Sequence, residues 1–139
     1  MRYFGKKYGY YPADIKEAYE VDKLSDDFYD NFNAFFGPMF FPPGPAQDGA
    51  IEGAVAAATK FCKMNEARLA KGQFMMGPKL YIIDFWLGGL YTNIIANPDC
   101  YGREQWAAFL KAHPAYDAYG KRFAAANKEY LDRRGPSPT

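Results

Sequence analysis

Apolar side chains recur at helical spacing along most of the chain, and clusters of proline and glycine separate one periodic stretch from the next. The first stretch covers residues 13–36 and ends at the proline-rich segment 37–45. We expect a second helix over about residues 47–70, followed by a loop at 72–79. Three more helices are expected after the loop, over about residues 81–93, 103–112 and 114–133. No strand pattern, repeat or internal linker interrupts this order. The sequence therefore predicts a single all-α domain.

The most apolar stretch, residues 80–91, contains one acidic side chain, Asp84. A carboxylate in a buried helix is costly unless it is hydrogen-bonded or paired. Near a helix start, its partners are the free backbone N–H groups at the positive end of the helix dipole. We therefore interpret Asp84 as a structural helix cap, not as a catalytic acid. We expect it to accept a hydrogen bond from the N–H of Tyr81 or Ile82.

Composition narrows the class of protein. The chain has 139 residues, of which 49% are hydrophobic and 19% aromatic, and this is enough to build one ordered core. The formal net charge is +1 and the Lys and Arg residues are scattered, so we expect no nucleic-acid partner. Because Asp84 interrupts the only long apolar run, we do not expect the chain to span a membrane.

The spacing of the cysteines and the opening residues indicate the cellular compartment and whether a metal or redox site is expected. Cys62 and Cys100 are too far apart to form a metal or redox motif, and the opening residues lack the apolar core of a signal peptide. We therefore expect an intracellular reducing compartment, the cytoplasm by default, and no metal site.

Four segments occur in an order that resembles one known family. They are the opening Arg2-Tyr3-Phe4-Gly5-Lys6-Lys7-Tyr8-Gly9-Tyr10-Tyr11-Pro12, the run Glu17-Ala18-Tyr19-Glu20-Val21-Asp22 with Asp26 and Asp30, the stretch Leu80-Tyr81-Ile82-Ile83-Asp84-Phe85, and Phe109-Leu110 through Tyr116 to Tyr119. Together they resemble the glutathione S-transferase family, nearest its sigma-like cytosolic classes. The resemblance implies that residues 1–12 are the last helix of the family's thioredoxin-like domain and the linker after it. Residues 13–134 would then form a glutathione S-transferase C-terminal-like helical bundle, followed by a flexible tail at 135–139.

The resemblance carries an expectation about function. In this family the residue that activates the glutathione thiol, and most of the glutathione pocket, belong to the thioredoxin-like domain. Because the chain would begin inside the last helix of that domain, we expect no catalytic residue and no cofactor in it. Two alternatives stay open. The chain could be the C-terminal part of an active glutathione transferase, which conjugates glutathione to electrophiles, or a ligand carrier with an apolar pocket near Phe40, Trp86 and Tyr91.

The resemblance also assigns positions for ligand binding. Asp30 matches the acid that reaches across a dimer to the amino end of glutathione. Phe35, Phe36 and Phe40 match the region that lines the apolar co-substrate site. The residue types by themselves equally fit a solvated acidic face and a set of core or interface aromatics.

Asp84 carries over as a folding residue of the family. Family members usually have Ser or Thr three positions before this acid, which completes a reciprocal capping box. Tyr81 occupies that position in this chain. The sequence therefore predicts that the cap depends on Asp84 alone.

The opening segment is the expected interaction surface. Without a thioredoxin-like domain to cover it, an apolar face would be exposed on the first long helix and the first dozen residues, which include Tyr3, Phe4, Tyr8 and Tyr10. Asp22 and Asp26 of the first long helix are further candidates for this interface. Asp22, Asp26 and Asp30 stack over about 12 Å of one helix face, and like charges at this spacing invite a partner. A contiguous apolar patch usually marks a binding surface. We therefore hypothesise a non-catalytic structural subunit, held by protein partners in a hetero-assembly or a homodimer.

Overall fold

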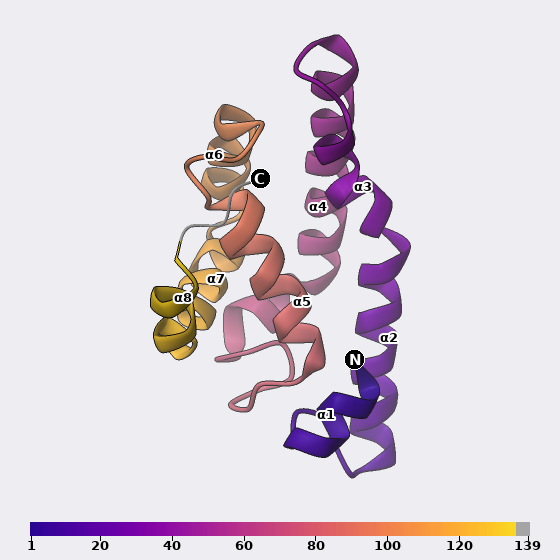
Figure 1. Ribbon diagram of the computed structural model, residues 1–139. Helices are drawn as coiled ribbons and strands as arrows, with labels where there is room; N and C mark the ends of the chain where they lie inside the picture. Colours follow the sequence, from indigo (N-terminus) through magenta and orange to yellow (C-terminus); the bar gives the residue numbers. More distant parts are fainter. Residues whose placement is uncertain (136–139) are drawn as a thin grey trace.

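The computed structural model describes residues 1–135, and every regular element in this part of the chain is helical, which confirms the all-α prediction (Figure 1). In chain order the elements are α1 (Arg2–Tyr8), α2 (Ile15–Asp30), α3 (Phe32–Phe36), the 3₁₀-helix η1 (Gly37–Phe40), α4 (Pro45–Lys71), α5 (Ile82–Leu90), the π-helical turn η2 (Tyr91–Ile95), α6 (Arg103–Ala112), α7 (Pro114–Ala126) and α8 (Lys128–Arg134). The tail expected at 135–139 lies outside the described residues except for Gly135.

Helix α5 lies at the centre of the arrangement. It contacts α2 on one side and α7 on the other, and the long helix α4 packs against α3, α6 and α7 (Figure 1). Burying a large apolar side chain contributes about 1.5–3 kcal/mol relative to leaving it in water. Each of these helices supplies such side chains to the core, among them Phe28, Phe35, Leu69, Ile83, Leu87, Trp106, Tyr116 and Tyr119.

Two of the expected helices divide at an asparagine. The stretch expected as one helix over 13–36 divides at Asn31, and the last one, expected over 114–133, divides at Asn127. Each Asn Nδ2 donates to the carbonyl oxygen four residues earlier, at 2.8 Å and 2.9 Å respectively. Asn65 makes the same hydrogen bond to the carbonyl of Phe61 (3.0 Å) inside the unbroken helix α4, so this bond is compatible with a helix end but does not by itself cause one. Apolar periodicity continues across both breaks, so the pattern alone does not reveal them.

Two other boundaries differ from the expectation. The helix predicted over 47–70 begins at Pro45, because proline lacks an N–H and its fixed φ suits the first turn of a helix. The helix predicted over 81–93 stops its α-helical bonding at Leu90 and continues as η2, which closes with a hydrogen bond from the N–H of Ala96 to the carbonyl of Tyr91 (2.8 Å).

Two glycines let α7 approach α5 and η2 closely. A Cβ atom at Gly88 of α5 would overlap the ring of Phe123, and a Cβ atom at Gly120 of α7 would overlap the ring of Tyr91. Each ring therefore packs directly against the backbone of the opposite element. The neighbouring Gly89 is different, because a Cβ atom there would have no neighbour closer than 3.9 Å.

The Asp84 carboxylate is fully buried at the start of α5 and accepts three hydrogen bonds. Oδ2 accepts from the N–H of Tyr81 (2.9 Å), which is one of the two donors expected from the sequence. Oδ1 accepts from the N–H of Met75 in the preceding loop and from the hydroxyl of Tyr119 on α7 (2.9 Å each). One side chain thus joins the start of α5, the loop before it and a helix that comes later in the chain.

The surroundings of this carboxylate also set its charge and complete the cap. Burial raises the pKa of the Asp84 carboxyl above its usual range, and the three hydrogen bonds oppose that rise. The N–H of Ile82, the second donor expected from the sequence, donates instead to the carbonyl of Tyr10 (3.0 Å). The N–H of Asp84 donates to the backbone carbonyl of Tyr81 (2.9 Å), so a backbone atom acts where family members use a Ser or Thr side chain.

Replacing Asp84 by alanine would remove the carboxylate from three buried donors, of which only the Tyr119 hydroxyl keeps another acceptor, the backbone carbonyl of residue 84 at 3.5 Å. Each unsatisfied group costs about 1–3 kcal/mol. We expect Asp84→Ala to lower the free energy of unfolding by about 3 kcal/mol or more in urea denaturation. Tyr119→Phe removes only one donor and keeps the ring, so its cost should be near 1 kcal/mol. A negligible loss for Asp84→Ala would contradict this account of the cap.

Adjacent glycines of α5 should respond to alanine with opposite signs. Gly88→Ala pushes a methyl group into the Phe123 ring, and overpacking of this kind costs about 1–3 kcal/mol. Gly89→Ala meets open space and gains about 0.5–1 kcal/mol from reduced backbone entropy of the unfolded chain. Differential scanning calorimetry should show a lower melting temperature for the first variant and a higher one for the second; shifts of the same sign would refute the packing argument.

Candidate functional site

Helix α1 is held to the bundle by its inner side. Gly5, its one buried residue, lies so close to α5 that a Cβ atom would overlap the side chain of Ile82. The helix ends at Gly9 with φ of 80°, a left-handed conformation that favours glycine. The next residue, Tyr10, accepts the hydrogen bond from the N–H of Ile82. Backbone contacts thus fix α1 and the segment after it against the start of α5.

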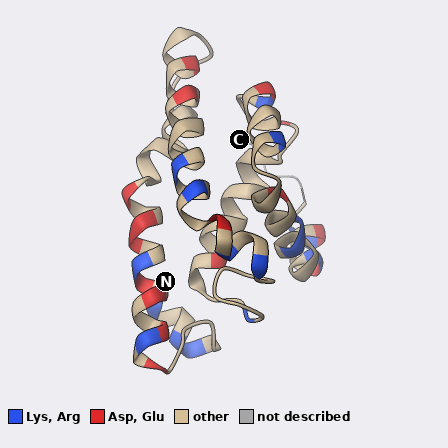
Figure 2. Ribbon diagram, turned by 180° about the vertical axis from the view of Figure 1, so that it is seen from behind, with Lys and Arg blue, Asp and Glu red and all other residues tan. Residues whose placement is uncertain are grey.

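Arg2 ties the beginning of α1 to the acidic face of α2, where Figure 2 shows the two signs of charge side by side. Its Nε donates to Asp22 Oδ1 (2.7 Å) and its Nη2 to Asp26 Oδ1 (3.3 Å). The Tyr11 hydroxyl donates to the other oxygen of Asp22 (2.9 Å). Hydrogen bonding to Asp22 raises the pKa of Arg2, while burial and the same carboxylate raise the pKa of Tyr11. Arg2 therefore offsets the like charges of two of the three stacked aspartates, Asp22 and Asp26.

The outer side of α1 presents three aromatic rings to solvent. Tyr3, Phe4 and Tyr8 are 70%, 58% and 61% exposed, and we call them the α1 aromatic face. Their rings contact one another: Tyr3 meets Phe4 edge-on at 5.4 Å between centroids, and Phe4 stacks with Tyr8 at 6.4 Å. Tyr10, the fourth aromatic expected here, is less exposed because its ring packs edge-on against Phe85 of α5 (4.9 Å).

A hollow of about 330 Å³ opens beside the first residues of α1. Its α5 side is apolar and its α2 side is polar. The floor at Trp86 is supported by the rings of Phe28 and Phe32, at 5.5 Å and 6.1 Å between centroids. The lining consists of Met1, Arg2, Ser25, Asp26, Tyr29, Ile82 and Trp86.

The structure does not bring together the four residues that the resemblance assigns to ligand binding. Asp30 is exposed at the last position of α2. Phe35 belongs to the core, where its ring packs against Phe28 at 5.2 Å. Phe36 is half-buried, and Phe40 is 82% exposed in η1. A core side chain and a fully exposed one do not line the same cavity, so these positions remain a prediction without a shared site.

The pocket considered for a ligand carrier, near Phe40, Trp86 and Tyr91, is not assembled either. Trp86 faces α2, where its ring lies 5.5 Å from that of Phe28. Tyr91 is buried on the opposite side, against α7, and its hydroxyl donates to Asp117 (2.8 Å). The two aromatic side chains therefore point to different neighbours of α5.

Within residues 1–135, no group of three or more His, Cys, Asp or Glu side chains could hold a metal ion. Burial raises the pKa of Cys62 to about 12, so this thiol stays protonated at neutral pH and is a poor nucleophile. Over the same residues, none of the helices combines the length and the apolar character needed to cross a bilayer.

Sequence patterns do not single out two residues of this region, Arg2 and Tyr29. A signal for Arg2 exists, because carboxylates at positions i and i+4 of one helix face predict a nearby cation. Tyr29 has no comparable signal. An exposed tyrosine on a helix has the same sequence context whether it borders a hollow or faces bulk water.

Comparison with known proteins assigns no family to this arrangement. No protein-family model matches the chain, and no curated protein matches it significantly. The likeness to glutathione S-transferases therefore depends on the four sequence segments and stays a prediction.

Removing the guanidinium should loosen α1 without unfolding the bundle. Arg2→Gln abolishes both ion pairs to α2, but exposed pairs contribute at most about 1 kcal/mol to global stability. We expect faster hydrogen exchange at the N–H groups of Gly5 and Tyr10, which donate within α1 and its end, and little change in the melting temperature. Lys16→Gln is the matched control, since the Lys16 side chain has no ion pair among the described residues. Equal exchange in both variants would contradict the anchoring role.

Proposed function

We propose that this chain is a non-catalytic, glutathione S-transferase-like helical domain that acts as a structural or interaction subunit of a larger protein assembly. The observation that carries the proposal is the α1 aromatic face, with three rings more than half exposed on one short helix. Exposed apolar patches of this kind mark interaction sites far more often than isolated surface side chains do. Aromatic residues are also enriched where protein interfaces are buried.

The way α1 is anchored supports an interface role. Its inner side is fixed by Gly5 against Ile82 and by the ion pairs of Arg2, so the outer rings do not hold the helix in place. The rings are nevertheless displayed on a defined scaffold and not on a loose terminus. A rigid aromatic surface loses little conformational entropy on binding, which favours affinity.

Charges around the face indicate the chemistry of the partner. Lys7 lies over the ring of Tyr8, with Nζ 5.2 Å from the centroid, and Lys6 lies over that of Tyr11 at the same distance. Neither lysine has a carboxylate partner among the described residues. The complementary surface is an apolar protein patch with acidic residues at its rim. In the family that the sequence resembles, a thioredoxin-like domain covers the corresponding helix face.

The double variant Phe4→Ser/Tyr8→Ser tests the proposal. Because both rings are solvent-exposed, the free energy of unfolding should change by no more than about 0.5 kcal/mol for each substitution. Native mass spectrometry of the tagged protein, isolated from its own cells, should show the unchanged chain in a complex and the double variant as a monomer. Met64→Ser is the matched control, because Met64 is similarly exposed (67%) but lies on α4.

Other results would replace this proposal. A monomeric protein that binds no hydrophobic dye would show that the α1 aromatic face is not an interface. A longer chain that contains this sequence, isolated as a homodimer with glutathione bound, would favour the active transferase instead.

A further inference from the structure

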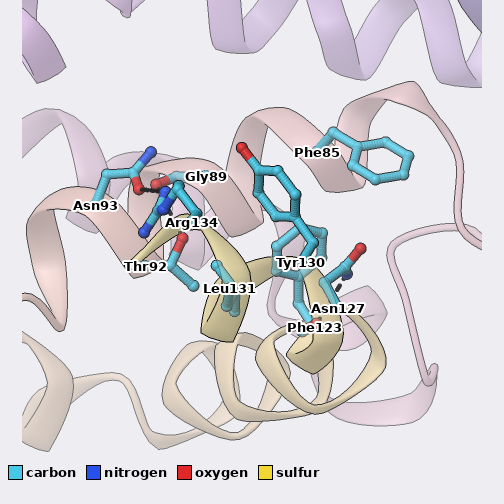
Figure 3. A pocket seen from close by; sticks show the side chains of 9 residues that line it. All are labelled: Phe85, Gly89, Thr92, Asn93, Phe123, Asn127, Tyr130, Leu131 and Arg134. Carbon is cyan, nitrogen blue, oxygen red and sulfur yellow. Dashed lines mark hydrogen bonds between the residues drawn. The ribbon is translucent and has the colours of Figure 1, made fainter. Parts of the chain in front are cut away.

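A second concave site lies between α5 with η2 and α7 with α8 (Figure 3). Its volume is about 400 Å³, within the range of small-molecule pockets. Aromatic rings gather at one side of it, and Thr92, Asn93 and Arg134 gather at the other (Figure 3). The cavity is therefore mainly aromatic at one end, where the amide of Asn127 lies beside Phe123, and polar at the other.

The apolar end is shaped for a flat ring. Phe85 and Phe123 meet edge-on, with 6.0 Å between centroids and an angle of 83° between their planes. Tyr130 of α8 extends over the same region, and Leu131 closes the side below it (Figure 3). Aromatic side chains at different angles present both faces and edges, which is the arrangement in which another aromatic ring packs best.

Among the described residues, the polar end carries one positive charge and no negative one. Arg134 is the only charged side chain of residues 1–135 that lines the cavity. Its guanidinium donates to Asn93 Oδ1 and lies 5.9 Å from the ring centroid of Tyr130, but no carboxylate within residues 1–135 pairs with it. A guanidinium held by an amide and an aromatic ring keeps donors available for a planar anion.

A glycine keeps the floor of the cavity open. Gly89 of α5 lines it, and a Cβ atom there would have no neighbour closer than 3.9 Å. The adjacent Gly88 has the opposite surroundings, because its lack of a side chain is required by the ring of Phe123. Close helix packing therefore explains Gly88 and does not explain Gly89, whose missing side chain creates space in the cavity.

We propose that this cavity binds a small aromatic carboxylate, with the ring among Phe85, Phe123 and Tyr130 and the carboxylate on Arg134. A cation is disfavoured by the guanidinium, and a fully apolar ligand would leave the available donors of this exposed group unused. The site does not depend on the function proposed for the α1 aromatic face. It adds a ligand site to a chain whose other surface is an interface.

The probe for the test is 2-naphthoate, titrated into the full chain by isothermal calorimetry, with the neutral 2-naphthylmethanol as comparison. We expect saturable binding of 2-naphthoate, weakened about tenfold in Arg134→Gln through loss of a charge-assisted hydrogen bond. Binding of the neutral compound should not respond to this substitution. Gly89→Leu fills the floor and should abolish binding of both compounds, whereas Gly89→Ala should retain it.

Chemical-shift mapping on the unaltered protein keeps the test independent of how the variants fold. With 15N-labelled protein, 2-naphthoate should shift the backbone signal of Gly89 and the side-chain Nε–H of Arg134, and leave Gly5 in α1 unshifted. No saturable binding at millimolar concentration, shifts elsewhere only, or undiminished binding in a folded Gly89→Leu variant would overturn the proposal. Unchanged affinity in Arg134→Gln would overturn the choice of a carboxylate. Phe4→Ser/Tyr8→Ser should bind 2-naphthoate normally, so the failure of one proposal can be told from that of the other.

Discussion

The buried carboxylate of Asp84 is the interaction on which the rest of this structure depends. Removing a carboxylate from water is costly, and the cost is offset here only because three donors converge on the two oxygens. The donors come from the start of α5, from the preceding loop and from α7. The carboxylate can therefore be satisfied only when all three parts are in their native positions. This makes it a device for specificity as well as for stability.

Helix α5, which begins at this carboxylate, contacts both of the surfaces for which we propose a function. At the start of α5, the side chain of Ile82 packs against Gly5 of α1, and the N–H of Ile82 donates to the carbonyl of Tyr10. Further along, Gly88 admits the ring of Phe123 and so sets the distance to α7, while Gly89 leaves the cavity open. The α1 aromatic face and the cavity under α8 thus share one support but present different shapes and charges. One is a set of exposed rings with lysines beside them, and the other is a concave site whose described residues include a single guanidinium.

The predictions that succeeded depend on short-range physics. Helical periodicity, proline and glycine located the helices and the loop at 72–79, because backbone hydrogen bonding within a helix links residues four apart. The breaks at Asn31 and Asn127 were missed although they are also local. Asn65 makes the same side-chain hydrogen bond inside the unbroken helix α4, so an asparagine by itself does not decide whether a helix ends there. Arg2 was not anticipated either: the spacing of Asp22, Asp26 and Asp30 indicated only an acidic face that invites a partner, and the structure pairs Arg2 of α1 with Asp22 and Asp26.

What the sequence by itself determined is the helical class, the approximate extents of the helices, and the need of a buried Asp84 for donors. Only the tertiary structure decided which groups donate to the Asp84 carboxylate. The donor at Tyr81 is three residues away in the chain, but those at Met75 and Tyr119 are nine and thirty-five residues away. The two glycines of α5 show the same division, since nothing in their sequence distinguishes the one that Phe123 contacts from the one that opens a cavity. Burial, cavities and long-range partners arise from the positions of several helices at once. Periodicity reports only which face of each helix is apolar, and not which neighbour covers it.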